Sequence, residues 1–425
     1  MRIAITHPYY WPYVRRGSER YVHDLSQYLA EAGHEVEVIT SKPGWFATRR
    51  EGAARIIHYP QLAHPFWGKA AVAAAYTVQG IARRSVDRLP FTYRDVSEAT
   101  TFIWSVFLST LVGRYDVVYC AFFGDCFGVR LHQPLSKRPF ILFFSGVPVA
   151  RALTPVQRRL LVSGLHFAAA AVMPSQISGH YLRTDFGKEP TVIPPGICMD
   201  QFQLRTAPRV EDSTILCVSS SQVELKNLPA LVSAFELVQR EIPNAKLQLC
   251  VSGDAAPAER LRAQASPASR DAIEVVAASD TAGMARLYAN ASVTVQPSLY
   301  ESFGLALAES LACGTPVVAA KSGALPELVD DPRIGSLFDV PIGNDGRPAD
   351  NREGICRAIL EAFELNRDHD TPERCRHHVS RYDWRVIGPE IERLCRRVAG
   401  GSQRTCLQQA TVQRRDSEPA TGGDG

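Results

Sequence analysis

The sequence predicts an α/β protein built from two doubly wound parallel-sheet domains. Short apolar strand patterns alternate with amphipathic helix patterns, and strands spaced by helices form parallel sheets covered on both faces. The alternation stops near the middle of the 425 residues and then restarts. A chain of this length also exceeds what a single hydrophobic core normally serves. We therefore expect two domains that face a cleft, with ligands bound at the carboxyl ends of the strands.

The first half of the chain predicts one such domain, residues 1–207. Strand-like runs of β-branched and other apolar residues occur at residues 2–6, 35–40, 116–120, 140–144, 171–173 and 191–193. Helix patterns lie between several of them, at residues 19–32, closed by Gly33, and at residues 155–170. Residues 49–97 are interpreted as helical, without an assigned place in the fold.

The second half predicts a domain at residues 208–385. Its strand patterns occupy residues 215–219, 247–251, 274–276, 293–296 and 317–320, and its helix patterns residues 228–240, 281–290 and 303–312. The boundary is placed in residues 202–213, a polar stretch that contains Pro208. A last amphipathic helix, residues 386–399, is expected to pack back on the first domain. Residues 400–425 have almost no large apolar side chains and are expected to be disordered.

The composition is that of a globular protein. Hydrophobic residues make up 45% and charged residues 21%, with a net charge of +3, so nothing indicates a nucleic-acid partner. The ten cysteines show no metal-ligand spacing and fit reduced thiols in the cytoplasm. The apolar run at residues 102–112 is shorter than the roughly twenty residues of a spanning helix, and a buried helix is favoured there over an interfacial one. The chain starts with a strand pattern rather than a signal peptide.

The most informative segment is VTVQPSLYESFGLALAESLACGTPVV, residues 293–318. A strand ends at Gln296, a short loop follows, and a helix is expected to open at Ser302-Phe303-Gly304. Gly304 allows a ligand to approach the backbone closely, and the free N–H groups of a helix start favour an anionic phosphate. The segment therefore predicts a phosphate site.

Two carboxylates frame this segment, Glu301 and Glu309, eight positions apart. On one helix they would lie about 12 Å apart along the axis and about 80° apart around it. A retaining glycosidase needs two carboxyl groups about 5–5.5 Å apart, so this pair suits the two ends of an extended ligand better. One carboxylate can hold sugar hydroxyls and the other ribose hydroxyls. Either glutamate alone is more simply explained as a solvated residue.

With this segment the chain resembles the retaining glycosyltransferases of the GT-B fold that carry the E-x7-E motif, family 4 or glycosyl transferases group 1. The resemblance extends from residue 1 to about residue 398. Further matching segments are Gly17-Ser18-Glu19-Arg20, Gly33-His34-Glu35-Val36, Pro194-Pro195-Gly196-Ile197, Lys226-Asn227, Val251-Ser252-Gly253-Asp254 and Tyr382-Asp383-Trp384. Together these segments are specific for the family and only weakly specific for the substrate.

The resemblance implies transfer from a nucleoside-diphosphate sugar with retention at the anomeric carbon, without a metal or a cofactor. Glu301 would orient the donor sugar, Glu309 would bind the ribose, and Lys226 would neutralise the departing diphosphate. Gly17 and Gly253 would form glycine turns of the donor site. The phosphates would be held by the backbone of Ser302, Phe303, Gly304 and Leu305.

Three positions depart from the family pattern. Arg16 stands where the family usually has the first of two loop glycines, and Ser221 where it usually has a donor-site arginine. Ser145 replaces a histidine near the reacting centre; it can hydrogen-bond a sugar hydroxyl but carries no charge. We hypothesise that Arg16 or Arg15 supplies the charge missing at Ser221, because an arginine fork suits a diphosphate. Equally, both arginines can be solvated surface residues.

The acceptor side is less well marked. His7 and Trp11 flank the glycine loop and are either acceptor contacts or packing residues, and Asp125 is a weaker acceptor candidate. Many members of the family extend glycans or polyprenyl-linked glycolipids, which implies such an acceptor for surface polysaccharide or glycolipid synthesis. That role would place the chain in the cytoplasm, as a peripheral protein on the inner face of the plasma membrane.

Two other functions stay open. One is an epimerase or hydrolase of the same fold that needs no acceptor, and the other is a non-catalytic nucleotide-sugar-binding protein. An NAD-dependent enzyme is excluded because no GxGxxG turn follows the first strand. Asp368-His369-Asp370 spells a metal motif of a different glycosyltransferase fold, but it lies between two late helices and is interpreted as a solvated loop.

Overall fold

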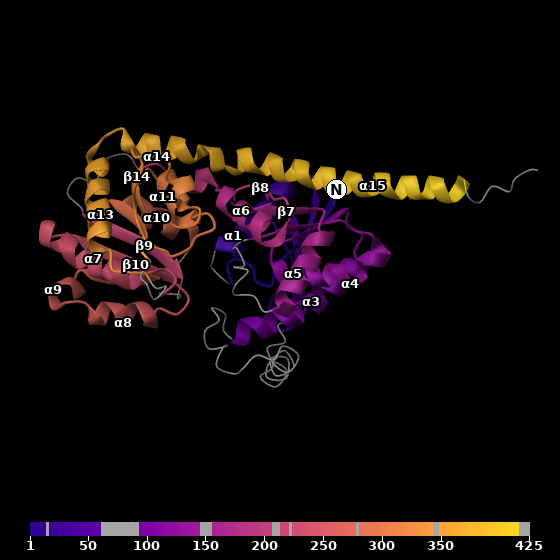
Figure 1. Ribbon diagram of the computed structural model, residues 1–425, viewed down its shortest axis with the longest axis horizontal. Coiled ribbons are helices and arrows are strands. Elements are labelled where there is room, and N and C mark those ends of the chain that lie inside the picture. Colours follow the sequence, from indigo (N-terminus) through magenta and orange to yellow (C-terminus); the bar gives the residue numbers. More distant parts are fainter. Residues whose placement is uncertain are drawn as a thin grey trace, which may run out of the picture.

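The computed structural model describes residues 1–13, 17–60, 93–144, 155–205, 213–220, 223–277, 280–342 and 348–415. Two lobes lie beside each other, and a long C-terminal helix starts where they meet and runs along the first lobe (Figure 1). Strands up to Val192 form one sheet, and strands from Thr214 onward form the other. The predicted α/β architecture of two doubly wound domains is therefore confirmed. The expected boundary at residue 207 falls in a segment outside the described residues.

The first sheet has eight strands in the order β3-β4-β2-β1-β5-β6-β7-β8. They are β1 Arg2–Thr6, β2 Glu35–Lys42, β3 Ala47–Glu51, β4 Ala54–Pro60, β5 Val117–Cys120, β6 Phe140–Phe143, β7 Ala170–Met173 and β8 Thr191–Val192. All neighbours pair in parallel except β3, which runs antiparallel to β4 at the edge. Ile3 lies between Val36 and Val117, which sets the central register.

The β3–β4 hairpin corrects one prediction. Residues 49–97 are expected to be helical, but residues 49–60 belong to two strands joined at Gly52, whose φ is +56°. The alternating exposure along β3 and the turn glycine are the strand signals that the prediction missed. A helix, α3, does cover Tyr93–Val112, and residues 61–92 lie outside the described residues.

Alternating residues of the first sheet face two helical layers. Ile3 and Ile5 pack toward α1 (Gly17–Glu31) and the terminal helix α15 (Trp384–Arg415), whereas Ala4 packs toward the opposite layer. That opposite layer consists of α3, α4 (Cys126–Ser136), α5 (Pro155–Phe167) and α6 (Gln176–Phe186). Figure 1 shows α15 on one side of this domain and α3, α4 and α5 on the other.

Helix α3 is apolar on both of its faces. Phe102, Val106 and Thr110 are buried under it, but Trp104 is 60% exposed and Leu108 is 53% exposed. The expectation of a fully buried helix is therefore wrong for its outer face. In the described part of the chain, no helix combines the length and the apolarity that crossing a bilayer requires.

The second sheet has six parallel strands in the order β11-β10-β9-β12-β13-β14. The strands are β9 Thr214–Ser220, β10 Lys246–Ser252, β11 Ile273–Ala277, β12 Val293–Gln296, β13 Val317–Ala320 and β14 Gly335–Phe338. The main covering helices are α7 Leu228–Glu241, α8 Ala256–Gln264, α10 Thr281–Asn290, α11 Leu305–Ala312, α13 Arg352–Arg367 and α14 Thr371–Val379. The strand order reverses between β9 and β12. Ligands of such sheets bind beside the carboxyl ends of those two strands.

Among the contacts between the described parts of the two domains, three bear on the arrangement of the site. The Arg376 guanidinium donates hydrogen bonds to the carbonyl of Met199 over 3.0 Å and to that of Ala312 over 2.6 Å, which ties the interdomain segment η4 (Met199–Gln201) to the end of α11. The Glu327 carboxylate of the second domain accepts from the N–H of Gln176 over 2.9 Å and from that of Ile177 over 2.7 Å, at the start of α6. The third contact, between α1 and α11, is part of the candidate site.

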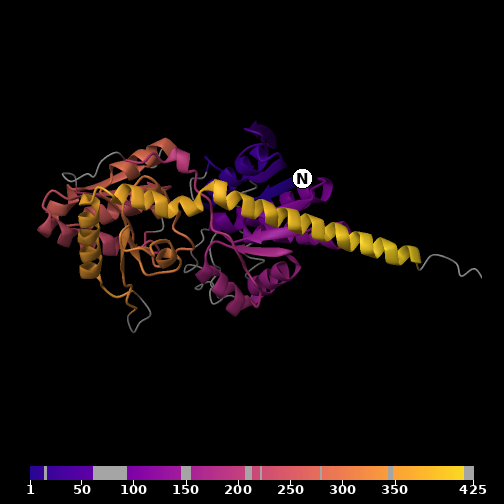
Figure 2. The same ribbon diagram turned by 90° about the horizontal axis from the view of Figure 1, so that it is seen from above.

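The terminal helix returns to the first domain. Trp384 lies against Gly196, and Ile387, Ile391 and Leu394 belong to the first domain's core. The helix then continues past the packed segment to Arg415, beyond the edge of the domain (Figure 2). The expectation of disorder from residue 400 is therefore wrong for residues 400–415. Extending an existing helix adds a hydrogen bond per residue without a new nucleation cost, which composition alone does not register.

Candidate functional site

A lysine and a glutamate meet at the carboxyl ends of β9 and β12. Lys226 Nζ donates to Glu301 Oε1, and their side chains retain 18% and 17% of their exposure, so both stay accessible. Ser298 Oγ donates to the same carboxylate oxygen over 2.8 Å, and Gln296 Nε2 donates to it over 2.9 Å. Three donors from two strand ends therefore fix one oxygen, and among the described residues none donates to Glu301 Oε2.

The backbone around Glu301 is held by two hydrogen bonds and by a close approach of Gly323. The N–H of Leu299 bonds to the carbonyl of Leu225 over 3.0 Å, and the N–H of Ala324 bonds to the carbonyl of Glu301 over 2.9 Å. Gly323 passes so close that a Cβ there would lie 2.1 Å from the Glu301 carbonyl oxygen. The loop that presents Glu301 is thus supported on both sides.

Gly304 forms the start of α11. Its φ of +103° is in the left-handed region, and a Cβ there would lie 2.8 Å from Leu325 Cδ2. The helix begins at Leu305, two residues later than the predicted start at residue 303. Phe303 is buried with its ring centroid 5.0 Å from that of Tyr382, so its side chain serves packing and only its backbone faces the predicted phosphate site. Ser302 remains partly exposed beside it.

The glycine loop of the first domain approaches this helix. A Cβ on Gly17 would lie 3.7 Å from Leu305 Cδ2, so the start of α1 and the start of α11 are adjacent across the domain interface. Gly253 follows β10 with a φ of +93° and lies exposed at the same edge of the second sheet. Gly253 thus follows a strand of the sheet that carries Lys226 and Glu301, and Gly17 faces the start of α11 from the first domain.

Glu309 is buried at the domain interface. Arg20 Nη1 of α1 lies 3.3 Å from Glu309 Oε1, and the Tyr288 hydroxyl donates to Glu309 Oε2 over 2.9 Å. Burial raises the pKa of the Glu309 carboxyl above its usual value, while Arg20 and the Tyr288 hydrogen bond oppose that rise. The sequence analysis included Arg20 in a matching segment without a role and did not identify Tyr288, because each reaches Glu309 only through tertiary packing.

The acceptor candidates have different surroundings. Trp11 is partly exposed, with the Arg20 guanidinium 5.7 Å from its ring centroid. His7 is buried, and its Nδ1 lies 2.7 Å from the carbonyl of Tyr9. Asp125 is buried, its carboxylate accepts from the Thr6 hydroxyl over 2.8 Å, and burial raises the pKa of this carboxyl well above its usual value. The acceptor roles of His7 and Asp125 stay predictions that the buried positions do not favour.

The three departures from the family pattern, Ser145, Arg16 and Ser221, lie outside the described residues, as does Arg15. The compensation between Arg16 and Ser221 therefore stays a hypothesis. Gln296 and Ser298 are functional candidates that the predictions missed. Their position at the end of β12, directly before Glu301, is the sequence signal that would have found them.

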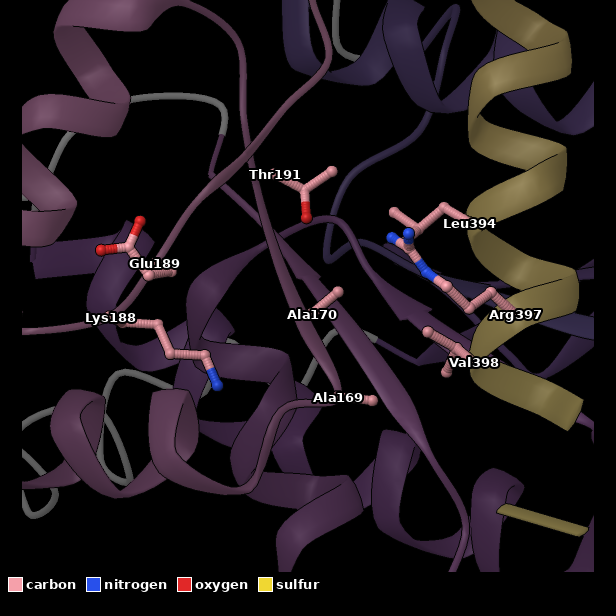
Figure 3. A pocket seen from close by; sticks show the side chains of 8 residues that line it. All are labelled: Ala169, Ala170, Lys188, Glu189, Thr191, Leu394, Arg397 and Val398. Atoms are coloured by element: carbon pink, nitrogen blue, oxygen red, sulfur yellow. The ribbon is translucent and has the colours of Figure 1, made fainter. Parts of the chain in front are cut away.

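Two other features lie away from this site. A cavity of about 370 Å³ opens between the β8 edge and α15, where Arg397 reaches toward Thr191 (Figure 3). No predicted site residue lines it. Asp368 and Asp370 both pair with Arg374, over 2.5 Å and 3.0 Å, in the exposed turn between α13 and α14. Within the described segments, no three His, Cys, Asp or Glu side chains come together as metal ligands.

Two family models match the chain. One, described as Glycosyltransferase Family 4, matches residues 15–201, and the other, described as Glycosyl transferases group 1, matches residues 212–364. The matches divide at the interdomain segment and cover the two sheets separately.

Individual relatives and solved structures agree with these matches. The chain is 27% identical to a D-inositol 3-phosphate glycosyltransferase of Pseudarthrobacter chlorophenolicus, over 76% of this chain and 78% of that protein. It is 29% identical to a phosphatidyl-myo-inositol mannosyltransferase of Mycobacterium tuberculosis, over 65% of this chain and 75% of that protein. In fold it resembles sucrose-phosphate synthase from Thermosynechococcus elongatus, with a TM-score of 0.75 and 21% identity over 94% of this chain and 99% of that one. Anabaena HepE in complex with UDP and glucose gives a TM-score of 0.64 at 16% identity, over 93% and 99% of the two chains.

Proposed function

This chain belongs to the glycosyltransferases of the GT-B fold, and on that premise we propose that it transfers a sugar from a nucleoside-diphosphate sugar with retention at the anomeric carbon. The observation that carries the proposal is the pair formed by Lys226 and Glu301 beside the start of α11. It places a cation, a carboxylate and a helix N-terminus at the switch point of one sheet.

The donor's diphosphate is proposed to lie at the start of α11, beside Gly304 and Lys226. Leu305 and the residues after it begin the helix, whose N-terminal dipole favours the negative charge that grows on the departing phosphate. Lys226 adds a full positive charge at the same place. Together they supply what a metal ion or a general acid would otherwise supply, so the proposed reaction uses neither a metal nor a cofactor.

The sugar is proposed to lie against Glu301. Its Oε2 can accept from sugar hydroxyls while Oε1 stays bound to Ser298 and Gln296. As the bond from the anomeric carbon to the phosphate oxygen breaks, the carboxylate stabilises the positive charge at that carbon. The acceptor hydroxyl attacks from the face that the phosphate leaves, and its proton passes to the departing phosphate oxygen. Configuration is thereby retained.

The acceptor is proposed to be a glycan or a lipid-linked glycolipid of surface polysaccharide or glycolipid synthesis. Two of the relatives are named for inositol-containing compounds, D-inositol 3-phosphate and phosphatidyl-myo-inositol. The outer face of α3 supports a membrane location, because its outward positions Trp104, Leu108, Leu111 and Val112 are all apolar. Neither α4 nor α5 carries an acidic residue. We therefore place the chain in the cytoplasm, peripherally attached to the inner face of the plasma membrane.

A donor screen tests the proposal. Purified protein is incubated with UDP-, GDP- and ADP-sugars in the presence of lipid and saccharide acceptors, and release of the nucleoside diphosphate is compared for wild type, Glu301→Gln and the surface control Glu353→Gln. Release that depends on one donor and on Glu301, but not on Glu353, supports transfer. Binding of a donor without release under any acceptor condition contradicts it and favours the non-catalytic function.

One observation favours an alternative that needs no acceptor. Two of the three predicted acceptor residues, His7 and Asp125, are buried rather than open to a second substrate. An epimerase or hydrolase of this fold would consume the donor at the same rate with and without acceptors. The product distinguishes the cases, since hydrolysis yields free sugar and transfer yields a glycosylated acceptor.

A further inference from the structure

The carboxylate expected to bind the donor's ribose is in contact with an arginine of the other domain. Glu309 belongs to α11 of the second domain, and Arg20 belongs to α1 of the first. Arg20 Nη1 lies 3.3 Å from Glu309 Oε1, and both side chains are more than nine-tenths buried. This ion pair is therefore shielded from solvent, and the buried Glu309 carboxylate depends on Arg20 to stay charged.

Arg20 is held in place by several further contacts. Its Nε lies 3.5 Å from Asp24 one turn later in α1, and its Nη2 donates to Gln201 Oε1 in the interdomain segment over 2.9 Å. Its guanidinium also lies 5.3 Å from the ring centroid of Phe202 and 5.7 Å from that of Trp11. One guanidinium thus connects α1, the interdomain segment and the donor-site carboxylate.

The charge state of Glu309 decides what it can bind. An ionised carboxylate offers about four acceptor positions, and a protonated one has fewer and becomes a donor itself. The Tyr288 hydroxyl uses one acceptor position and Arg20 another, which leaves two for a pair of vicinal hydroxyls. Burial disfavours the ionised form, so a neighbouring cation is needed to retain it.

From these contacts we infer that Arg20 is a positioning residue of the donor site, supplied by the first domain, which keeps the Glu309 carboxylate ionised and oriented for the two ribose hydroxyls. The inference rests on the proposed function, because it assumes that the donor's ribose binds Glu309. It adds that donor affinity depends on the relative position of the two domains. Separating α1 from α11 would leave Glu309 buried without its cation and weaken its hold on the ribose.

The test measures binding of UDP, GDP and ADP by calorimetry, between about pH 5.5 and pH 8, with the nucleotide that binds wild type best carried forward. Arg20→Gln removes the charge, Arg20→Lys keeps it, and Glu309→Gln tests the carboxylate itself. Arg2→Gln is the matched control, since Arg2 pairs with Glu35 over 3.1 Å at the opposite end of β1.

We expect Arg20→Gln to weaken nucleotide binding about tenfold near neutral pH, because the ion pair that keeps Glu309 charged is lost. The deficit should grow as the pH falls, because the pKa of Glu309 rises without Arg20 and the carboxyl protonates sooner. The charged groups and hydroxyls facing Glu309 are Arg20 and Asp24 of α1 and Tyr288 of α10, with Cys313 at the end of its own helix. Arg20→Lys should restore most of the affinity, and Arg2→Gln should bind as wild type does.

Two outcomes overturn the inference and are distinct from failure of the proposed function. If Arg20→Gln matches wild type across the pH range while Glu309→Gln binds weakly, the donor site stands and Arg20 has no part in it. If Arg20→Gln is equally weak at every pH and Arg20→Lys does not rescue it, Arg20 is only structural. If Glu309→Gln itself binds as wild type does, the proposed donor site is wrong.

A second variant keeps the test decisive if Arg20→Gln does not fold. The Asp24 carboxylate competes with Glu309 for Arg20, and its charge raises the pKa of Glu309. Asp24→Asn removes that charge. It should move the pH at which nucleotide affinity falls in the opposite direction, toward lower pH. Unchanged pH dependence in Asp24→Asn, with normal thermal unfolding, overturns the inference.

Discussion

Lys226 Nζ and Glu301 Oε1 are in contact although 75 residues separate them in the chain. The contact exists because β9 and β12 are neighbours in the second sheet and end at the same edge. Two loops that follow adjacent parallel strands therefore place a cation against a carboxylate at the site where the sheet's ligand is expected.

Removing the charge of Lys226 should slow the reaction more than it harms the fold. With the best donor, Lys226→Gln is expected to lower turnover about 100-fold, because one charge-stabilising group is lost from the departing diphosphate. Lys188→Gln is the matched control, since Lys188 Nζ donates to the carbonyl of Ala168 in the remote cavity. Turnover is measured as nucleotide release. Equal turnover of Lys226→Gln and Lys188→Gln would contradict the role of Lys226.

Gly304→Ala should destabilise the protein and weaken donor binding. The residue has a left-handed φ, and the added methyl group would lie 2.8 Å from Leu325 Cδ2. We expect a loss of about 2–3 kcal/mol in the free energy of unfolding. Gly187→Ala separates the two causes, because Gly187 has a φ of +64° but nothing within 4 Å of the added atom. Denaturant unfolding should show a loss for Gly187→Ala of about 1 kcal/mol; equal losses in the two variants would rule out the Leu325 contact.

Glu327 should stabilise the arrangement of the domains. Its carboxylate accepts from two N–H groups at the start of α6, which belongs to the other domain. Glu327→Gln removes the charge at this helix terminus and is expected to cost about 1 kcal/mol. Thermal unfolding should therefore begin at lower temperature than in Glu353→Gln, an exposed first-turn glutamate of α13. A melting curve identical to that of Glu353→Gln would show that the contact contributes nothing.

His58 should make the stability of the first domain fall in mild acid. The side chain is fully buried, neither ring nitrogen has a hydrogen-bond partner among the described residues, and burial together with Lys42 and Arg49 lowers its pKa to about 4. The unfolded chain binds the proton near pH 6.5, so the stabilisation is complete above that value and is lost as the pH falls toward 4. The loss amounts to about 3 kcal/mol if the proton difference is complete.

Unfolding of His58→Phe should show a shallower decline over the same pH range. His180→Phe, at an exposed position of α6, serves as the control and should keep the wild-type slope. A wild-type slope in His58→Phe, measured by denaturant titration at several pH values, would assign the acid sensitivity to another group.

The outer face of α3 should bind anionic vesicles. Trp104 and Leu108 lie one turn apart on that face, and exposed arginines and lysines such as Arg114 and Lys137 lie at its margin. The double variant Trp104→Ser with Leu108→Ser is expected to reduce cosedimentation with vesicles of anionic phospholipid by about tenfold. Ile342→Ser removes a 63% exposed apolar side chain of the second domain and should leave binding unchanged. Equal binding of both variants would place the membrane contact elsewhere.

The sequence by itself determined the two-sheet fold and the centre of the candidate site. Period-two and helical apolar patterns located every predicted strand within a few residues, because these patterns reflect which side chains must be buried. Glu301 and Gly304 were identified from a local segment, and Lys226 from the resemblance to the family. Short strands at the sheet edges were missed. β14 was not predicted, and the β3–β4 hairpin was interpreted as helical because its turn signal was not recognised.

Only the tertiary structure decided which distant groups meet. Arg20 contacts Glu309, and Glu327 contacts the start of α6, across an interface between domains. No local pattern marks these residues, because a buried ion pair or a helix cap supplied from another domain depends on how two independently formed sheets are packed. For the same reason, the apolar run of α3 did not by itself predict which of its faces is buried. Its composition required a helix, but only the packing of α4 beside it decided that one face is buried and the other remains exposed.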